Sequence, residues 1–304
     1  WDGEKMSSSV GNNIPLTAPP RSWDAWVEAM ARVRREAEWL ARNGREVDVY
    51  ALRRPTDAPA GITDGVNVRR LDVQRHQGAS PIRYVAEYLS FLVRAAAALT
   101  AAHRTRRYTL VQVHTIPDFL VFAALHFRLA GIPVILDVHE AMPEFFRLRF
   151  PAAANPLIHG ALKFQERASI WAATVAVPAN EGLEARLLDL GVPASKMRLI
   201  RNTADLVRFD PTRYPHRPFM ADGRLRLAYT GALTPIYEVD VAIDAVAALR
   251  AVHPDLPVDL HLYGRGDSAD ALRKQATDLG LADAVHFHGR IPIEDVPAAV
   301  ARAD

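Results

Sequence analysis

Residues 110–139 read LVQVHTIPDFLVFAALHFRLAGIPVILDVH and show the pattern from which the fold class is predicted. Two short apolar runs rich in β-branched residues, at 110–114 and 134–138, lie on either side of a longer apolar segment at 119–130. We expect the short runs to be strands and the longer segment to be a helix. Continuous apolar strands separated by helices are typical of a parallel sheet covered on both faces. The stretch therefore predicts one strand–helix–strand unit of an α/β fold.

The same alternation continues in both directions from this unit. Towards the N-terminus we expect a helix from about Trp23 to Asn43-Gly44, strands at 47–52 and 66–73, and a helix at 82–103. Towards the C-terminus, helices at 156–172 and 182–190 alternate with strands at 174–177 and 197–200. Beyond these, strands at 225–229, 258–263 and 285–287 alternate with helices at 239–250, 269–279 and 294–303. The pattern predicts a doubly wound α/β architecture.

Breaks in this rhythm suggest the domain boundaries. Residues 1–22 are rich in Gly, Ser, Asn and Pro, and we expect a loop or tail of foreign origin there. A first Rossmann-type domain is expected over 23–203, a linker over 204–224 and a second Rossmann-type domain over 225–304. Because a doubly wound domain usually needs about five or six strands, the second domain is expected to be incomplete. The start at Trp1 likewise suggests part of a longer protein.

The composition is that of an ordinary soluble protein and excludes several functional classes. The 304 residues are 49% hydrophobic and 24% charged, and 37 Lys and Arg residues against 35 Asp and Glu residues give a net charge of +2. This balance argues against a polycationic nucleic-acid-binding protein. The absence of cysteine excludes disulfides and thiolate metal sites. No apolar run is expected to reach the roughly 20 residues that a membrane span needs.

Candidate catalytic residues follow two of the predicted strands. His114 ends the run at 110–114, whereas Asp137, His139 and Glu140 come at the end of the run at 134–138. In an open parallel sheet, ligands bind beyond the carboxyl ends of the strands. A histidine there is suited to orienting or polarising a substrate group, although a hydrogen bond to a loop carbonyl would explain it equally well. For the second group, hydrogen-bonding or acid–base roles are favoured over a metal site.

Glycine-containing turns after two strands of the second domain are candidate phosphate-binding loops. The first is TGALT at 230–234 and the second is YGRG at 263–266. Backbone N–H groups in such turns can bind an anion, although a tight turn is the commoner reason for a glycine there. The first turn lacks the Gly-Lys-Ser/Thr ending of a P-loop.

Two further segments have simpler interpretations. The basic stretch at 32–35 is expected to be a solvated helix face. Aromatic residues alternate with arginines at 145–150, a pattern that suits a membrane interface or a lipid-linked partner. Arginines that cover a patch between domains would produce the same pattern.

Taken together, the segments over residues 32–304 resemble the retaining GT-B glycosyltransferases of the family-four group. RVRREAEWLARNGREVDV at 32–49 is similar to the first helix and second strand of that family. VHTIPD at 113–118 and ILDVHEAMPE at 135–144 resemble its acceptor-domain signatures, and IRN at 200–202 resembles its approach to the hinge. YTGAL at 229–233, LYGRG at 262–266 and VHFHG at 285–289 resemble the strand ends of its donor domain.

This resemblance implies a GT-B fold, in which two Rossmann-type domains face a cleft. It implies transfer of a sugar from a nucleotide-sugar to a glycan, lipid or small-molecule acceptor, with retention of configuration and without a metal or other cofactor. The implied partners are the nucleotide-sugar and a glycan or lipid-linked acceptor, with no nucleic acid; peripheral membrane contact is suggested only by the pattern at 145–150. The implied setting is cytoplasmic synthesis of cell-envelope polysaccharide.

The resemblance also implies roles for individual residues. His114 would lie near the transferred sugar, and His139 and Glu140 would line the acceptor side. On the donor side, the loop with Thr230, Gly231 and Thr234 would approach the diphosphate. The loop with Tyr263, Gly264 and Gly266 would approach the nucleoside, and Arg290 and Ile291 would approach the base.

Three features depart from the family pattern. No basic residue occurs within 234–238, the paired acidic motif that grips the donor sugar would lie beyond Asp304, and nothing before residue 32 matches the first strand and its glycine loop. Instead, GEKMSSSVGNNIPLT at 3–17 resembles the KMSKS loop of tyrosyl- or tryptophanyl-tRNA synthetases. Three alternatives therefore stay open: a glycosyltransferase in truncated form, an inactive fragment or remnant that only binds nucleotide-sugars, and a protein related to aminoacyl-tRNA synthetases.

Overall fold

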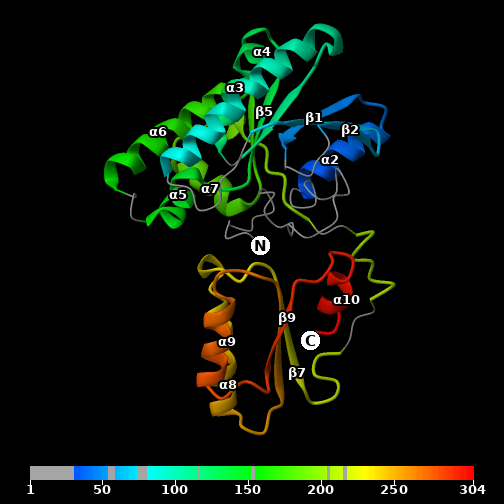
Figure 1. The fold of residues 1–304 in the computed structure, drawn as a ribbon, viewed down its shortest axis with the longest axis vertical. Helices are drawn as coiled ribbons and strands as arrows, with labels where there is room; N and C mark the ends of the chain where they lie inside the picture. The colour runs from blue at the N-terminus through cyan, green and yellow to red at the C-terminus, as the bar shows by residue number, and fades with distance from the viewer. Residues whose placement is uncertain are drawn as a thin grey trace. The chain divides into compact units, whose positions relative to one another are not determined.

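The computed structural model describes residues 31–53, 59–73, 81–115, 117–151, 155–203, 206–214 and 218–304. These residues form two compact units, an N-terminal unit that ends at Asn202 and a C-terminal unit from Thr203 to Asp304 (Figure 1). The tail predicted at 1–22, its resemblance to the KMSKS loop and the helix start at Trp23 lie outside the described residues.

The described part of the N-terminal unit contains two three-stranded sheets. In the first, of order β1-β3-β2, β3 is parallel to β1 and antiparallel to β2. In the second, of order β4-β5-β6, all strands are parallel. The strands are β1 (Val47–Leu52), β2 (Ala60–Thr63), β3 (Val66–Leu71), β4 (Val111–His114), β5 (Val134–Val138) and β6 (Val175–Pro178).

Helices surround these sheets and bury the main core around β5. Val134, Leu136 and Val138 of β5 are buried with Phe127 and Leu187 in one apolar cluster. Two of the helices begin at asparagine caps, because the Asn155 and Asn180 side chains accept hydrogen bonds from the backbone three residues on. The helices are α2 (Ala31–Arg42), α3 (Pro81–Arg106), α4 (Leu125–Leu129), α5 (Met142–Arg149), α6 (Pro156–Ala172) and α7 (Glu181–Asp189), with 3₁₀ segments η3 (Asp118–Ala124) and η5 (Ala194–Lys196).

The C-terminal unit is built on one parallel sheet of order β7-β8-β9. Burial alternates along β8, and Val258, Leu260 and Leu262 pack with residues of α8 and α9 in a second apolar cluster. The opposite face of β8 carries Asp259 and His261. The elements are β7 (Leu225–Thr230), η6 (Pro235–Tyr237), α8 (Val239–Val252), β8 (Val258–Tyr263), α9 (Ala269–Asp278), β9 (Val285–Gly289) and α10 (Val296–Val300).

The predicted α/β fold with parallel strands is confirmed, and several element predictions are wrong. At 197–200 the chain forms an isolated bridge between Met197 and Ala176 rather than a strand. Backbone hydrogen bonds to β6 run from Arg198 N and Ile200 N, at 3.0 and 3.3 Å. The segment predicted as one helix at 119–130 is divided between the 3₁₀ helix η3 and the short α-helix α4. The antiparallel strand β2 and helix α5 were not predicted, and α5 buries Phe145 and Phe146, which the sequence pattern had suggested for a membrane interface.

The expectation that no apolar run is long enough to span a membrane is also wrong. Residues Ile82–Arg106 of α3 are long and apolar enough by length and composition, with a mean hydropathy of 1.4 and 17% of the window buried. One such helix is weak evidence of a membrane span, since the core helix of a soluble protein passes the same test.

Candidate active site

Two imidazoles and a carboxylate lie together at the ends of β4 and β5. Asp137 Oδ2 lies 3.0 Å from His114 Nδ1 and 3.3 Å from His139 Nε2, and these two nitrogens are 3.3 Å apart. The strand register places His114 directly opposite Asp137, and His139 follows two positions later on the same face. The side chain of His114 is 14% exposed, whereas those of Asp137 and His139 are 0% and 2% exposed. His114 is therefore the member of the group that a substrate can reach most easily.

A buried guanidinium from α2 completes this group. Arg32 Nε lies 2.8 Å from Asp137 Oδ2, and Arg32 Nη1 donates to Ile200 O at 2.6 Å. Because only 5% of Arg32 is exposed, the prediction of a solvated face at 32–35 is wrong for this residue. The first turn of α2 lies at the carboxyl edge of the second sheet. There Arg32 pairs with the buried carboxylate of Asp137 and is not solvated.

The protonation state of Asp137 suits an orienting role. Burial by itself would raise the pKa of Asp137, but hydrogen bonds from His114 and His139 outweigh it and hold that pKa well below its usual range. The donor atoms of these three residues lie within 4.8 Å of one another, so they could also hold a metal ion. Since Arg32 already places a positive charge on the same carboxylate, we favour the hydrogen-bonding role.

Thr115 fixes the loop in which the second histidine lies. Its N–H donates to Asp137 O at 3.0 Å, and its Oγ1 accepts a hydrogen bond from the His139 N–H at 2.9 Å. Glu140 follows directly and is half-buried. The structure thus brings His114 and His139 together and places Glu140 at the same strand end.

A cavity of about 960 Å³ opens beside this group within the N-terminal unit. Residues of α2, β1, α3 and β4 line it, and His114 and Thr115 lie in its wall. Among the described residues, no strand pairs with the side of β1 or of β4 that lies away from its own sheet. The catalytic candidates are therefore next to a space large enough for a small ligand.

A second buried carboxyl group lies at the start of η3. Asp118 is 4% exposed, and burial raises its pKa to about 6, although Gln165, backbone N–H groups and Arg186 act in the opposite direction. Arg186 itself lies 2.9 Å from Glu166 and 2.7 Å from Glu144. No separate role for Asp118 was predicted from the sequence.

In the C-terminal unit, the two glycine turns pack directly against each other. A Cβ atom on Gly264 would lie 1.7 Å from Gly231 O, and one on Gly266 would lie 2.1 Å from Leu233 O. Backbone hydrogen bonds run from Gly231 N to Tyr263 O and from Leu233 N to Arg265 O, at 2.9 and 2.8 Å. Close approach of the two turns is thus a sufficient reason for both Gly264 and Gly266.

One polar atom in these turns lacks a partner. Thr234 is 7% exposed, and its buried Oγ1 has no hydrogen-bond partner among the described residues. A buried hydroxyl of this kind is normally satisfied, so Thr234 Oγ1 is a candidate hydrogen-bond partner for a ligand or a water. The remaining candidates follow the same edge, with Thr230 at the end of β7, Tyr263 at the end of β8 and the half-buried Arg290 and Ile291 just after β9.

Two family models match the chain, one in each unit. The model of the glycosyl transferase 4-like domain matches residues 29–203, and the model of glycosyl transferases group 1 matches residues 214–304. The chain belongs to the glycosyl transferase 4-like family. No curated protein matches the chain.

Solved glycosyltransferase structures share the fold of this family member. Sucrose-phosphate synthase from Thermosynechococcus elongatus is 19% identical with a TM-score of 0.69, over 97% of this chain and 72% of that one. HepE from Anabaena, in complex with UDP and glucose, is 17% identical with a TM-score of 0.53, over 79% of this chain and 60% of that one. A glycosyltransferase from Rickettsia africae is 9% identical with a TM-score of 0.55, over 86% and 64%. These likenesses show the GT-B fold.

Two residues of the glycosyltransferase-like site were missed by the sequence reasoning. Arg32 was taken for surface because its neighbours are charged, and only the long-range contact with Asp137 reveals its burial. Asp118 follows a proline at a helix start, which is an ordinary surface position. The sequence pattern within a single segment predicts neither the burial of Arg32 nor that of Asp118.

Proposed function

We propose that this chain carries the donor and acceptor half-sites of a retaining glycosyltransferase that uses a nucleotide-sugar. The observation that carries the proposal is the His114–Asp137–His139 group at the strand ends of the family-matched N-terminal unit. In the proposed reaction, the bond between the anomeric carbon and the diphosphate oxygen breaks. A bond forms from an acceptor hydroxyl oxygen to the same face of that carbon, and the hydroxyl proton passes to the diphosphate.

His114 would contact the transferred sugar, since its exposed edge borders the cavity. His139 and Glu140 would line the acceptor side. Asp137 would hold both imidazoles by hydrogen bonds, and Arg32 would balance its charge. No metal is assigned a role, because protein cations and hydrogen-bond donors can stabilise the leaving diphosphate.

The donor would bind along the carboxyl edge of the C-terminal sheet. Thr230, Gly231 and the unpartnered Thr234 hydroxyl would approach the diphosphate, and the turn after β8 would approach the nucleoside. Arg290 and Ile291 would contact the base. The bound UDP in HepE supports this class of donor by analogy of fold.

The acceptor would be a glycan or a lipid-linked glycan, and the reaction would take place in the cytoplasm at a membrane surface. Exposed apolar side chains support membrane contact, because Leu157, Phe164 and Trp171 of α6 are 83%, 75% and 60% exposed at spacings of seven residues. Since the chain spans 72% of sucrose-phosphate synthase and 60% of HepE, the activity is proposed for the protein that contains these residues.

A second candidate is a chain that binds nucleotide-sugars without turnover. The absence of a basic residue in TPIYE at 234–238 favours it, because the leaving diphosphate then has one fewer cation nearby.

Calorimetric binding of UDP, GDP and their common sugar conjugates tests the proposal. We expect micromolar binding of one nucleotide, loss of binding in Thr234→Val, and slow donor hydrolysis or transfer to added acceptors. Binding without any turnover would favour the second candidate, and no binding of any nucleotide would contradict both.

A further inference from the structure

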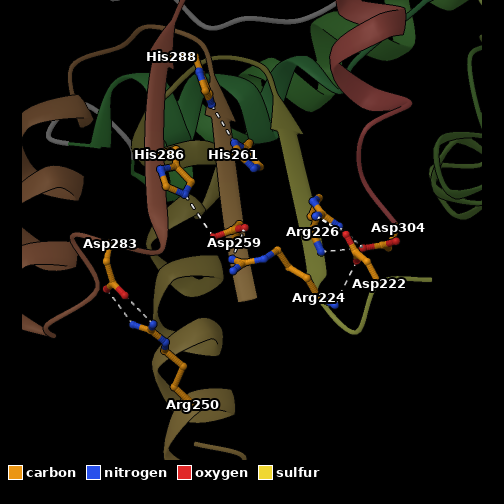
Figure 2. A network of polar contacts seen from close by, with 10 residues as sticks. All are labelled: Asp222, Arg224, Arg226, Arg250, Asp259, His261, Asp283, His286, His288 and Asp304. Atoms are coloured by element: carbon orange, nitrogen blue, oxygen red, sulfur yellow. Dashed lines mark hydrogen bonds and ion pairs between the residues drawn. The ribbon is translucent and has the colours of Figure 1, made fainter. Parts of the chain in front are cut away.

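Three imidazoles and a carboxylate share one face of the C-terminal sheet (Figure 2). Along β8, Asp259 and His261 alternate with buried residues, so both side chains lie on the face opposite the apolar cluster. The register pairs His261 directly with His286 of β9. A β-bulge follows this pair, and His288 joins the same group from β9.

The four side chains are already in contact. His286 Nε2 lies 3.3 Å from Asp259 Oδ1, and His261 Nδ1 lies 2.9 Å from His288 Nε2. The His261 ring stacks on the rings of His286 and His288, with centroids 4.8 and 5.2 Å apart. Donor atoms of Asp259, His261 and His286 all lie within 4.8 Å of one another.

We propose that Asp259, His261 and His286 bind a divalent transition-metal ion of the Zn²⁺ type on this face, with His288 holding the His261 ring in place. Two nitrogens and one carboxylate oxygen form a common donor set for Zn²⁺, with a fourth position left for water. Tetrahedral bonds of about 2.0 Å place neighbouring donors about 3.3 Å apart, which is the separation of the His286 and Asp259 donors.

The contact between His288 and His261 supports this site. The hydrogen bond between His261 and His288 resembles the contacts that orient metal-binding histidines.

Nearby arginines limit the affinity without blocking the site. Arg224 Nη1 lies 2.8 Å from Asp259 Oδ2, which leaves Oδ1 facing His286. Arg226 lies directly opposite Asp259 in the register of β7 and β8, so it adds a second positive charge beside the site. We therefore expect micromolar rather than nanomolar binding.

The test is a titration of the tag-free, metal-free protein with Zn²⁺ by calorimetry and with Co²⁺ by visible absorption. We expect one tetrahedral Co²⁺ site and a higher Tm for the C-terminal unit when Zn²⁺ is bound. His261→Ala and His286→Ala should each weaken binding about tenfold or more. Arg224→Gln should tighten it several-fold, since it removes the competing charge from Asp259.

Two controls separate this cluster from others. His253→Ala removes an exposed histidine of the same unit and should leave binding unchanged, and His114→Ala removes a donor of the other histidine cluster and should leave the Co²⁺ spectrum unchanged. If an alanine variant fails to fold by circular dichroism, the matching asparagine variant replaces it. The proposal is overturned if Zn²⁺ and Co²⁺ do not bind, or if binding survives the loss of both His261 and His286.

Discussion

At the end of β5, the carboxylate of Asp137 contacts two imidazoles and one guanidinium. Asp137 is fully buried, so each of its contacts is made in a medium of low dielectric, where charge interactions are strong. His139 is held on the inner side and His114 on the outer side of this carboxylate. The arrangement leaves His114 both oriented and accessible.

His114→Ala should lower transfer about 10²–10⁴-fold and leave the fold intact, because the side chain is partly exposed and contacts substrate in the proposed reaction. Turnover with the donor identified by calorimetry, together with thermal unfolding, measures both effects. His126→Ala, an exposed histidine of α4, serves as the control and should retain full activity. A His114→Ala enzyme with normal turnover would remove this residue from the mechanism.

Asp118→Asn should stabilise the protein at neutral pH but not in acid. Since burial raises the folded-state pKa to about 6, from an unfolded value near 3.8, the carboxyl costs nothing while protonated and destabilises the fold increasingly as pH rises from about 4 to 6. The gain above pH 6 is at most about 3 kcal/mol. Urea unfolding of both proteins at pH 4 and pH 8 measures it, and an equal difference at the two pH values would contradict the assignment.

At the scale of elements, the two glycine turns of the C-terminal unit depend on each other's backbone. Gly264→Ala should destabilise this unit by about 1–3 kcal/mol and abolish nucleotide binding, because its Cβ would overlap Gly231 O. The control is Gly160→Ala in α6, where a Cβ meets nothing within 4 Å. That change should stabilise the N-terminal unit by about 1 kcal/mol. Chemical denaturation of each variant, with and without nucleotide, measures its stability and its nucleotide binding. Unchanged nucleotide binding in Gly264→Ala would show that the turn tolerates a side chain.

Helix α6 is the element that we expect to contact membranes. Replacing Leu157, Phe164 and Trp171 together with serine should weaken binding to anionic vesicles about tenfold or more, because three exposed apolar side chains are lost. Vesicle co-sedimentation measures the change. Val252→Ser in α8 removes an exposed apolar residue elsewhere and should have no effect. Equal sedimentation of all three proteins would count against membrane contact through α6.

The sequence was informative where a pattern is local and silent where a contact is long-range. The run at 134–138 is continuous and apolar because β5 is covered on both sides, and its bounds were predicted to the residue. By contrast, AGIT at 60–63 has no strong strand signal, and β2 forms through pairing with β3. Helix α5 was missed because alternating aromatics and arginines conceal two neighbouring phenylalanines, Phe145 and Phe146, that are both buried. The strand ends with His114 and His139 were found, but their common partner Arg32 lies in a distant segment.

At the scale of the whole molecule, each unit has its own apolar core. One core surrounds β5 and the other surrounds β8. We therefore expect two unfolding transitions by calorimetry, of which only the one that belongs to the C-terminal unit moves to higher temperature when the binding nucleotide is added. A single transition that shifts as a whole would show that the units unfold together.

The open edges of β1 and β4 beside the cavity have a consequence for exchange of backbone hydrogens with deuterium. In a parallel strand, successive amides point to opposite sides. The amides of Val111 and Thr115 donate to Pro133 and Asp137 on the side of the neighbouring strand β5, each at 3.0 Å. Those of Gln112 and His114 therefore point the other way, where no described strand accepts them. Alternate amides along β4 should therefore exchange at rates that differ by orders of magnitude. A peptide that bound in the cavity as an added strand would slow the exchange of the Gln112 and His114 amides alone. The exchange rates along β4 would therefore report whether such a strand is bound.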